Sequence, residues 1–133
     1  MNRVLIVDDE LMNRDVLKKV LGKEGFAVAE ASNGEEAMAL LDEVSFGLVL
    51  MDLMMPVMDG FETIAAIRCQ ERYRELPLVV ITALNDPASL ERAIALGADA
   101  CIVKPFDLPL LVQTVRDALE EGRRAPAAGE KDG

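Results

Sequence analysis

The sequence predicts an α/β fold in which a five-stranded parallel sheet carries helices on both faces. Short apolar runs alternate with segments whose apolar residues recur at helical spacing, and parallel strands require such helical crossovers. The 133 residues, 51% of them hydrophobic, suit a single hydrophobic core. Five strand and helix units are too few for an eight-unit barrel, so we expect an open sheet.

The first half of the chain predicts strand, helix, strand, helix and strand in turn. Its strands are short apolar runs beside turn residues: Val4–Val7, the weaker Ala27–Ala31, and Leu48–Met51. Its helices carry apolar residues at helical spacing: Val16, Leu17, Val20 and Leu21 in the first, and Ala37, Leu40, Leu41 and Val44 in the second. We expect Gly22 and Gly25 to end the first helix, and Ser32 or Asn33 to cap the second.

The second half of the chain continues the alternation. Strand patterns occur at Leu78–Thr82 and Ala100–Val103. Helices are expected to begin at Gly60, at the capping pair Asp86-Pro87, and after Asp107. Their apolar faces are Ile64 and Ile67, then Leu90, Ala93 and Ile94, and finally Leu108, Leu111, Val112, Val115 and Leu119. Periodicity stops at Gly122, so we expect one domain over residues 1–122 and a flexible tail or linker stub over residues 123–133.

The composition excludes several classes of protein. A formal charge of −10 argues against direct binding of nucleic acid, and no apolar stretch approaches the roughly 20 residues of a membrane span. The chain opens in a strand pattern rather than a leader, so we expect a cytoplasmic location. Cys69 and Cys101 form no CxxC pattern and are expected to be buried, reduced thiols. Since the chain has no histidine, any histidine in its mechanism must belong to a partner.

Polar side chains stand where four of the predicted strands end. Ligands of open α/β sheets bind at this carboxyl edge. Asp8 and Asp9 follow the first strand and Asp52 follows the third. In the flavodoxin-like strand order 2-1-3-4-5 the first and third strands are neighbours, so these carboxylates would form one cluster. Three carboxylates so close repel one another unless a cation neutralises them, and Mg²⁺ is the natural ion for oxygen ligands.

The other two strand ends supply groups suited to a phosphoryl group. Thr82 offers a hydroxyl donor and Lys104 a positive charge. Aspartate is a recognised covalent phosphoacceptor, so the set predicts transfer of a phosphoryl group onto Asp52. Taken singly, Asp8 and Asp9 would be helix caps, Thr82 a strand residue and Lys104 a solvated lysine. Their joint placement favours the phosphoryl site.

From residue 3 to about residue 121, the chain resembles the receiver domain of bacterial two-component response regulators. The matching motifs, in order, are Asp8-Asp9, Asp52-Leu-Met-Met-Pro-Val-Met-Asp-Gly60, Thr82-Ala83, Gly97-Ala98-Asp99 and Lys104-Pro105-Phe106. The resemblance implies that Asp52 accepts a phosphoryl group from a phosphohistidine of a sensor histidine kinase or a histidine phosphotransfer protein. The protein would catalyse only its own phosphorylation and dephosphorylation, and would not otherwise be an enzyme.

The resemblance also implies a role for each residue of the site. Asp9, Asp52 and the main-chain carbonyl of Met54 would ligate Mg²⁺, with Asp8 acting largely through water. Lys104 would pair with the phosphoryl group, its bond to Pro105 would be cis, and Thr82 would move toward the phosphate. The change would reach a downstream target protein through the face formed by the fourth helix, the fifth strand and the fifth helix.

Two positions depart from the pattern of the family. Cys101 stands where many members carry an aromatic residue that swings inward, and Ala100 stands where many dimerising transcriptional receivers carry a second acid. The sequence therefore leaves open how the signal leaves Asp52 and whether the chain dimerises. One alternative is a phosphorylation-independent docking scaffold, slightly favoured by Cys101. Another is a dehalogenase-like phosphatase, which is disfavoured because position 54 is methionine where such enzymes have an acid.

Overall fold

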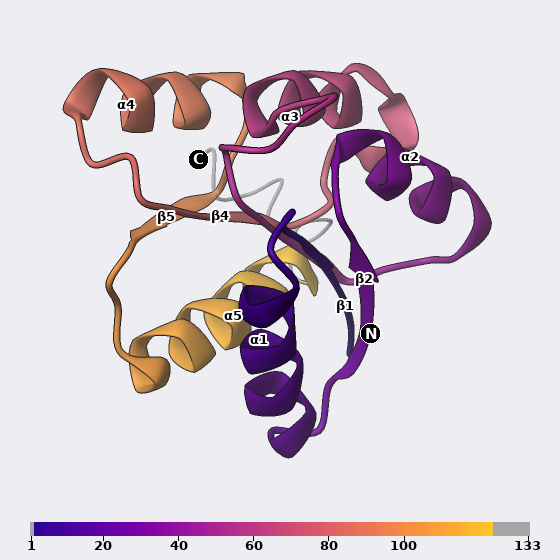
Figure 1. Ribbon diagram of the computed structural model, residues 1–133. Helices are drawn as coiled ribbons and strands as arrows, with labels where there is room; N and C mark the ends of the chain where they lie inside the picture. The colour runs from indigo at the N-terminus through magenta and orange to yellow at the C-terminus, as the bar shows by residue number, and fades with distance from the viewer. Residues whose placement is uncertain (1, 124–133) are drawn as a thin grey trace, which may run out of the picture.

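The computed structural model describes residues 2–123, in which five strands form one sheet between two layers of helices (Figure 1). The strands are β1 (Arg3–Val7), β2 (Ala27–Ala31), β3 (Leu48–Met51), β4 (Leu78–Thr82) and β5 (Ala100–Val103). The helices are α1 (Leu11–Lys23), α2 (Gly34–Glu43), α3 (Gly60–Cys69), α4 (Pro87–Leu96) and α5 (Leu108–Arg123), with a short 3-10 helix η1 (Glu71–Tyr73). None of these helices is long and apolar enough to cross a membrane.

All strand pairs are parallel, and the strand order β2-β1-β3-β4-β5 confirms the predicted topology. Helices α1 and α5 cover one face of the sheet, and α2, α3 and α4 cover the other (Figure 1). The chain reverses its direction of winding between β1 and β3, which is where ligands bind in sheets of this kind. Val7 is in register with Met51, so the residues that follow them, Asp8 and Asp52, leave the sheet side by side.

Two apolar clusters, one on each face of the sheet, form the core. One packs Leu5, Val49 and Val80 against α2 and α3, and the other packs Ile6 and Leu50 against α1 and α5. Every residue of β3 and β4 is buried, as expected for strands covered on both faces. The residues that follow β3 and β4 therefore emerge directly from the core.

The predicted helix caps are confirmed, whereas some predicted helix ends and core positions are wrong. Asn33 and Asp86 accept hydrogen bonds from main-chain N–H groups of α2 and α4. Gly22 lies inside α1 rather than ending it, and the chain turns only at Gly25, whose φ of +92° favours glycine. Helix α5 continues to Arg123, one residue past the predicted domain end; the rest of the predicted tail lies outside the described residues.

Four side chains predicted to be buried are exposed: Val16, Ile94, Cys69 and Leu108, which is 43% exposed at the first residue of α5. Val16 is 52% exposed and Ile94 is 48% exposed. Their neighbours Leu17 and Ala93 face the core instead, and one residue along a helix turns the side chain by about 100°. Cys69 is exposed at the end of α3, and Cys101 is half-buried, although both are free thiols as expected. The apolar spacing located these helices correctly but made their buried faces too wide.

Candidate functional site

Asp52 directly follows the central strand β3, and hydrogen bonds fix both its main-chain N–H and its two carboxylate oxygens. Its N–H donates to the carbonyl of Val7 at 3.0 Å, which ties it to β1. Oδ1 accepts a hydrogen bond from the N–H of Met54 at 3.0 Å, and Oδ2 lies 3.0 Å from Nζ of Lys104. The residue is 8% exposed. A carboxylate is thus presented in one orientation at the edge of the core.

Asp8 is held by three further hydrogen bonds at the end of β1. Its N–H donates to the carbonyl of Ala31 at 3.1 Å, and its Oδ1 accepts from the N–H of Glu10 at 2.9 Å. Oδ2 accepts from Asn13 at 3.4 Å. Burial is the main cause that raises the pKa of Asp8, and it outweighs the Glu10 N–H and Lys104, which lower that pKa; the negative charge of Asp52 adds a smaller rise. The buried pair of carboxylates is short of positive charge.

Lys104 reaches across the sheet from the end of β5 and contacts both carboxylates. Its Nζ lies 3.0 Å from Asp52 and 3.7 Å from Asp8. Burial alone would lower the pKa of Lys104, but the hydrogen bond to Asp52 and the charges of Asp52 and Asp8 outweigh it and raise that pKa. The expected cis bond between Lys104 and Pro105 is present. The lysine therefore carries its positive charge directly beside the Asp52 carboxylate.

A cavity of about 820 Å³ opens beside these groups. Its lining includes Asp9, Asp52, Met54, Ala83 and Lys104. Thr82, which precedes Ala83, is fully buried at the end of β4, and its Oγ1 accepts a hydrogen bond from the N–H of Leu84 at 3.1 Å. Thr82 is therefore not among the described residues that line the cavity, although Ala83 beside it is.

The carboxylates have the chemistry that Mg²⁺ prefers, but they do not form the cluster of three that the sequence predicts. Within residues 2–123, no three acidic, cysteine or histidine side chains stand close enough together to hold an ion. Lys104 lies against both Asp8 and Asp52, while Asp9 is exposed at the cavity. Mg²⁺ keeps several waters and needs only one or two carboxylates, so the oxygen donors present still fit this ion.

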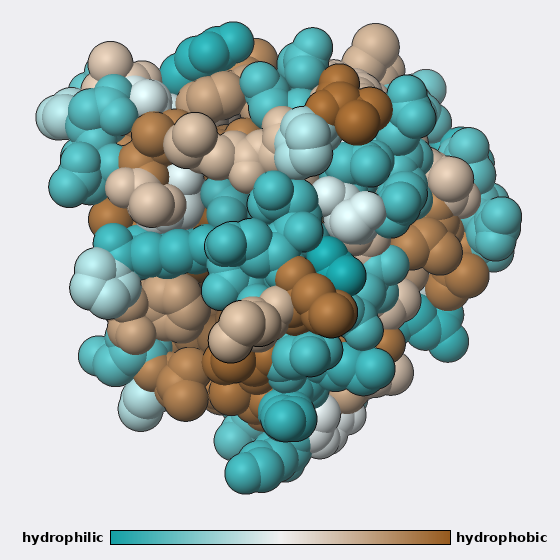
Figure 2. Space-filling view, in the orientation of Figure 1, coloured by the Kyte–Doolittle hydropathy of each residue, from teal (hydrophilic) through white to brown (hydrophobic). Residues whose placement is uncertain are grey.

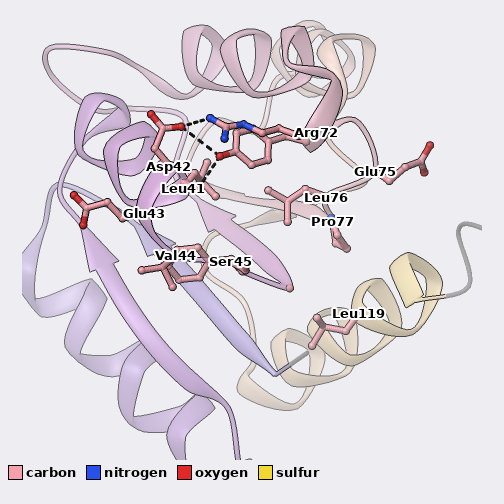
Figure 3. A pocket seen from close by; sticks show the side chains of 13 residues that line it. Leu41, Asp42, Glu43, Val44, Ser45, Arg72, Glu75, Leu76, Pro77 and Leu119 are labelled. Atoms are coloured by element: carbon pink, nitrogen blue, oxygen red, sulfur yellow. Dashed lines mark hydrogen bonds and ion pairs between the residues drawn. The ribbon is translucent and has the colours of Figure 1, made fainter.

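A second cavity, of about 530 Å³, opens at the opposite edge of the sheet, before β3 and β4 begin (Figure 3). Three of its polar side chains have partners: Arg72 forms an ion pair with Asp42, and the Tyr73 hydroxyl donates to the main-chain carbonyl of Leu41 at 2.7 Å. It holds none of the residues predicted for phosphoryl transfer. The candidate site is therefore the cavity at the carboxyl edge.

Sequence reasoning missed the side chains that support the site. Arg14 on α1 donates to the main-chain carbonyl of Asp8, and Glu30 on β2 accepts from Arg14. Asp59 forms a reciprocal capping box with Glu62 at the start of α3, beside the loop that follows Asp52. The spacing of Asp59 and Glu62 could have revealed the capping box. No sequence pattern reveals Arg14 and Glu30, because they meet only when α1 packs on β2.

A family model described as the response regulator receiver domain matches residues 4–116. The transcriptional regulatory protein SrrA of Staphylococcus aureus is 38% identical over 118 residues, which cover 89% of this chain and 48% of that protein. The chain thus spans about half the length of such curated relatives.

Solved structures with the same fold include the chemotaxis protein CheY4 of Vibrio cholerae. It is 34% identical, with a TM-score of 0.84, over 89% of this chain and 98% of that one. The receiver domain of the sensor histidine kinase PA1611 of Pseudomonas aeruginosa is 26% identical, with a TM-score of 0.83, over 90% of this chain and 98% of that one. That structure has a magnesium ion coordinated in its active site cleft.

Proposed function

Because this chain belongs to the response regulator receiver domain family, we propose that Asp52 is the phosphoacceptor of a two-component phosphorelay. The observation that carries the proposal is that both oxygens of the Asp52 carboxylate accept hydrogen bonds. One accepts from the N–H of Met54 and the other from Nζ of Lys104, each at 3.0 Å. Phosphoryl transfer needs positioning and charge neutralisation more than side-chain chemistry, and this arrangement supplies both.

In the proposed reaction a carboxylate oxygen of Asp52 attacks the phosphorus of a phosphohistidine on the partner. The new O–P bond forms as the P–N bond breaks, and the histidine nitrogen keeps the electron pair of that bond. Lys104 moves from pairing with the carboxylate to pairing with a phosphoryl oxygen. Mg²⁺ held by Asp8, Asp9, Asp52 and the Met54 carbonyl would supply further positive charge for those oxygens.

The proposed partners are a phosphohistidine donor and a downstream target. Since the chain has no histidine, a sensor histidine kinase or a histidine phosphotransfer protein must supply one. We place the contact with the downstream target on the face formed by α4, β5 and α5, because two apolar side chains there are exposed: Ile94 by 48% and Leu110 by 50%. In the view of Figure 2, hydrophobic side chains also gather over α1 and the start of α5. Two free thiols support a reducing, cytoplasmic compartment.

The proposal is tested by phosphorylating the chain with acetyl phosphate in the presence of Mg²⁺ and measuring its intact mass. We expect a gain of one phosphoryl group in the wild type and none in Asp52→Asn, because an amide oxygen is a poor nucleophile. Asp42→Asn, at the opposite edge of the sheet, is the matched control and should gain the group normally. An adduct that persists in Asp52→Asn would overturn the assignment, and an equal yield without Mg²⁺ would remove the metal from the reaction.

One observation favours a phosphorylation-independent docking scaffold instead. Cys101 is half-buried on β5, where it replaces the aromatic residue that many receivers move on activation. If the chain is a scaffold, the wild type and Asp52→Asn should bind the target equally well, whether or not acetyl phosphate is present. A phosphorylation switch would bind differently only when the wild type is phosphorylated.

A further inference from the structure

We propose that Arg14 is a positioning residue for Mg²⁺, because it fixes the peptide group that joins the two acidic residues Asp8 and Asp9. The inference rests on the proposed function, in which both of these residues help to hold the ion. It adds a residue outside the acidic cluster, located on α1 and oriented by the edge strand β2.

The contacts of Arg14 form a chain from the edge of the sheet to the site. Nη1 of Arg14 donates to the main-chain carbonyl oxygen of Asp8 at 2.7 Å. Nε donates to Oε1 of Glu30 at 3.0 Å, and Nζ of Lys18 lies 3.3 Å from the other oxygen of Glu30. The Arg14 side chain is only 15% exposed, which distinguishes this network from a solvated surface ion pair. Glu30 therefore aims the guanidinium, and the guanidinium holds the carbonyl.

That carbonyl belongs to the peptide group that joins Asp8 to Asp9. Asp8 has its own supports, since its side chain accepts hydrogen bonds from Glu10 and Asn13. Asp9 is exposed, and within residues 2–123 no hydrogen bond or ion pair holds its carboxylate. The direction in which Asp9 points thus depends on the plane of the Asp8–Asp9 peptide group. Holding the carbonyl oxygen of a planar peptide group sets that plane.

The sign of the effect separates positioning from electrostatics. Arg14 is a cation close to a site that would bind a cation. If it acted only through its charge, removing it would strengthen Mg²⁺ binding, because repulsion between two positive charges would be lost. If it acts by orienting the acidic residues, removing it weakens Mg²⁺ binding, as the loss of groups behind a metal's direct ligands does in other proteins.

The test is the dissociation constant of Mg²⁺ for the full chain, measured by isothermal titration calorimetry. We expect Arg14→Gln to raise this constant about tenfold. Arg14→Lys, which can reach the carbonyl but not Glu30 as well, should fall between Arg14→Gln and the wild type. Arg116→Gln is the matched control, because Arg116 on α5 forms an ion pair with Glu24 at the end of α1, so the variant removes the same charge and should leave the constant near the wild-type value.

Unchanged or tighter Mg²⁺ binding by Arg14→Gln, in a protein that melts cooperatively, would overturn the inference. If Arg14→Gln does not fold, equal binding by Arg14→Lys and the wild type would overturn it. Failure of the proposed function looks different, because the wild type itself would then bind no Mg²⁺ and gain no phosphoryl group.

Discussion

The residue that best shows the conflict between stability and function is Asp8. It is 3% exposed and lies beside a second buried carboxylate, with one lysine shared between them. Burial and the charge of Asp52 raise the pKa of Asp8, so the folded state holds its charged form less favourably than the unfolded chain does. A residue kept at a cost in stability points to use of the charge elsewhere, here in the proposed Mg²⁺ site.

Asp8→Asn should stabilise the protein at neutral pH by about 0.5–2 kcal/mol, measured by urea unfolding without Mg²⁺. The sign follows from the raised pKa. Below the usual aspartate pKa the carboxyl group is protonated in both states and carries no penalty; the penalty grows as the pH rises through the raised pKa of the folded state. The gain in stability from Asn should therefore be large near pH 7 and small near pH 3. A gain that is the same at both pH values would contradict this account.

At the scale of elements, Arg68 ties α3 to the segments around it. Its guanidinium donates to the main-chain carbonyls of Gly97, Tyr73 and Leu76 at 3.0, 2.8 and 2.7 Å. These carbonyls belong to the end of α4, to η1 and to the approach to β4. Gly97 has a φ of +127°, and a Cβ there would lie 2.6 Å from the Arg68 side chain, so the close approach of α4 to α3 requires glycine.

Arg68→Met should lower the free energy of unfolding by about 2–4 kcal/mol, because three part-buried carbonyls would lose their donor. The side chain is 15% exposed, so water does not replace these hydrogen bonds freely. Arg72→Met is the matched control. Both members of its ion pair with Asp42 are 58% exposed, and it should cost less than about 1 kcal/mol. Equal losses for the two variants in urea unfolding would show that Arg68 is only another surface arginine.

At the scale of the whole molecule, the sequence predicted what depends on neighbours along the chain. The strands, the cap residues Asn33 and Asp86, and the meeting of Asp52 with Lys104 follow from local patterns and from the rule for strand order. The exposure of Val16 and the contact of Arg14 with Glu30 could not be predicted, because they depend on the angle at which α1 packs on the sheet. Packing of that kind is set by the side chains of several elements together.

Because the acidic site is short of positive charge, we expect Mg²⁺ to stabilise the whole fold. An ion that binds only the folded state adds about 2.7 kcal/mol at 100 times its dissociation constant, so the melting temperature should rise with Mg²⁺ concentration. The rise should be lost in Asp52→Asn, in which one of the two buried carboxylates is neutral, and kept in Asp42→Asn, which lies at the opposite edge of the sheet. Circular dichroism melts in Mg²⁺ and in NaCl of equal ionic strength separate specific binding from screening. If both salts raise the melting temperature equally, the gain comes from screening of the net charge of −10 rather than from an ion bound at the proposed Mg²⁺ site.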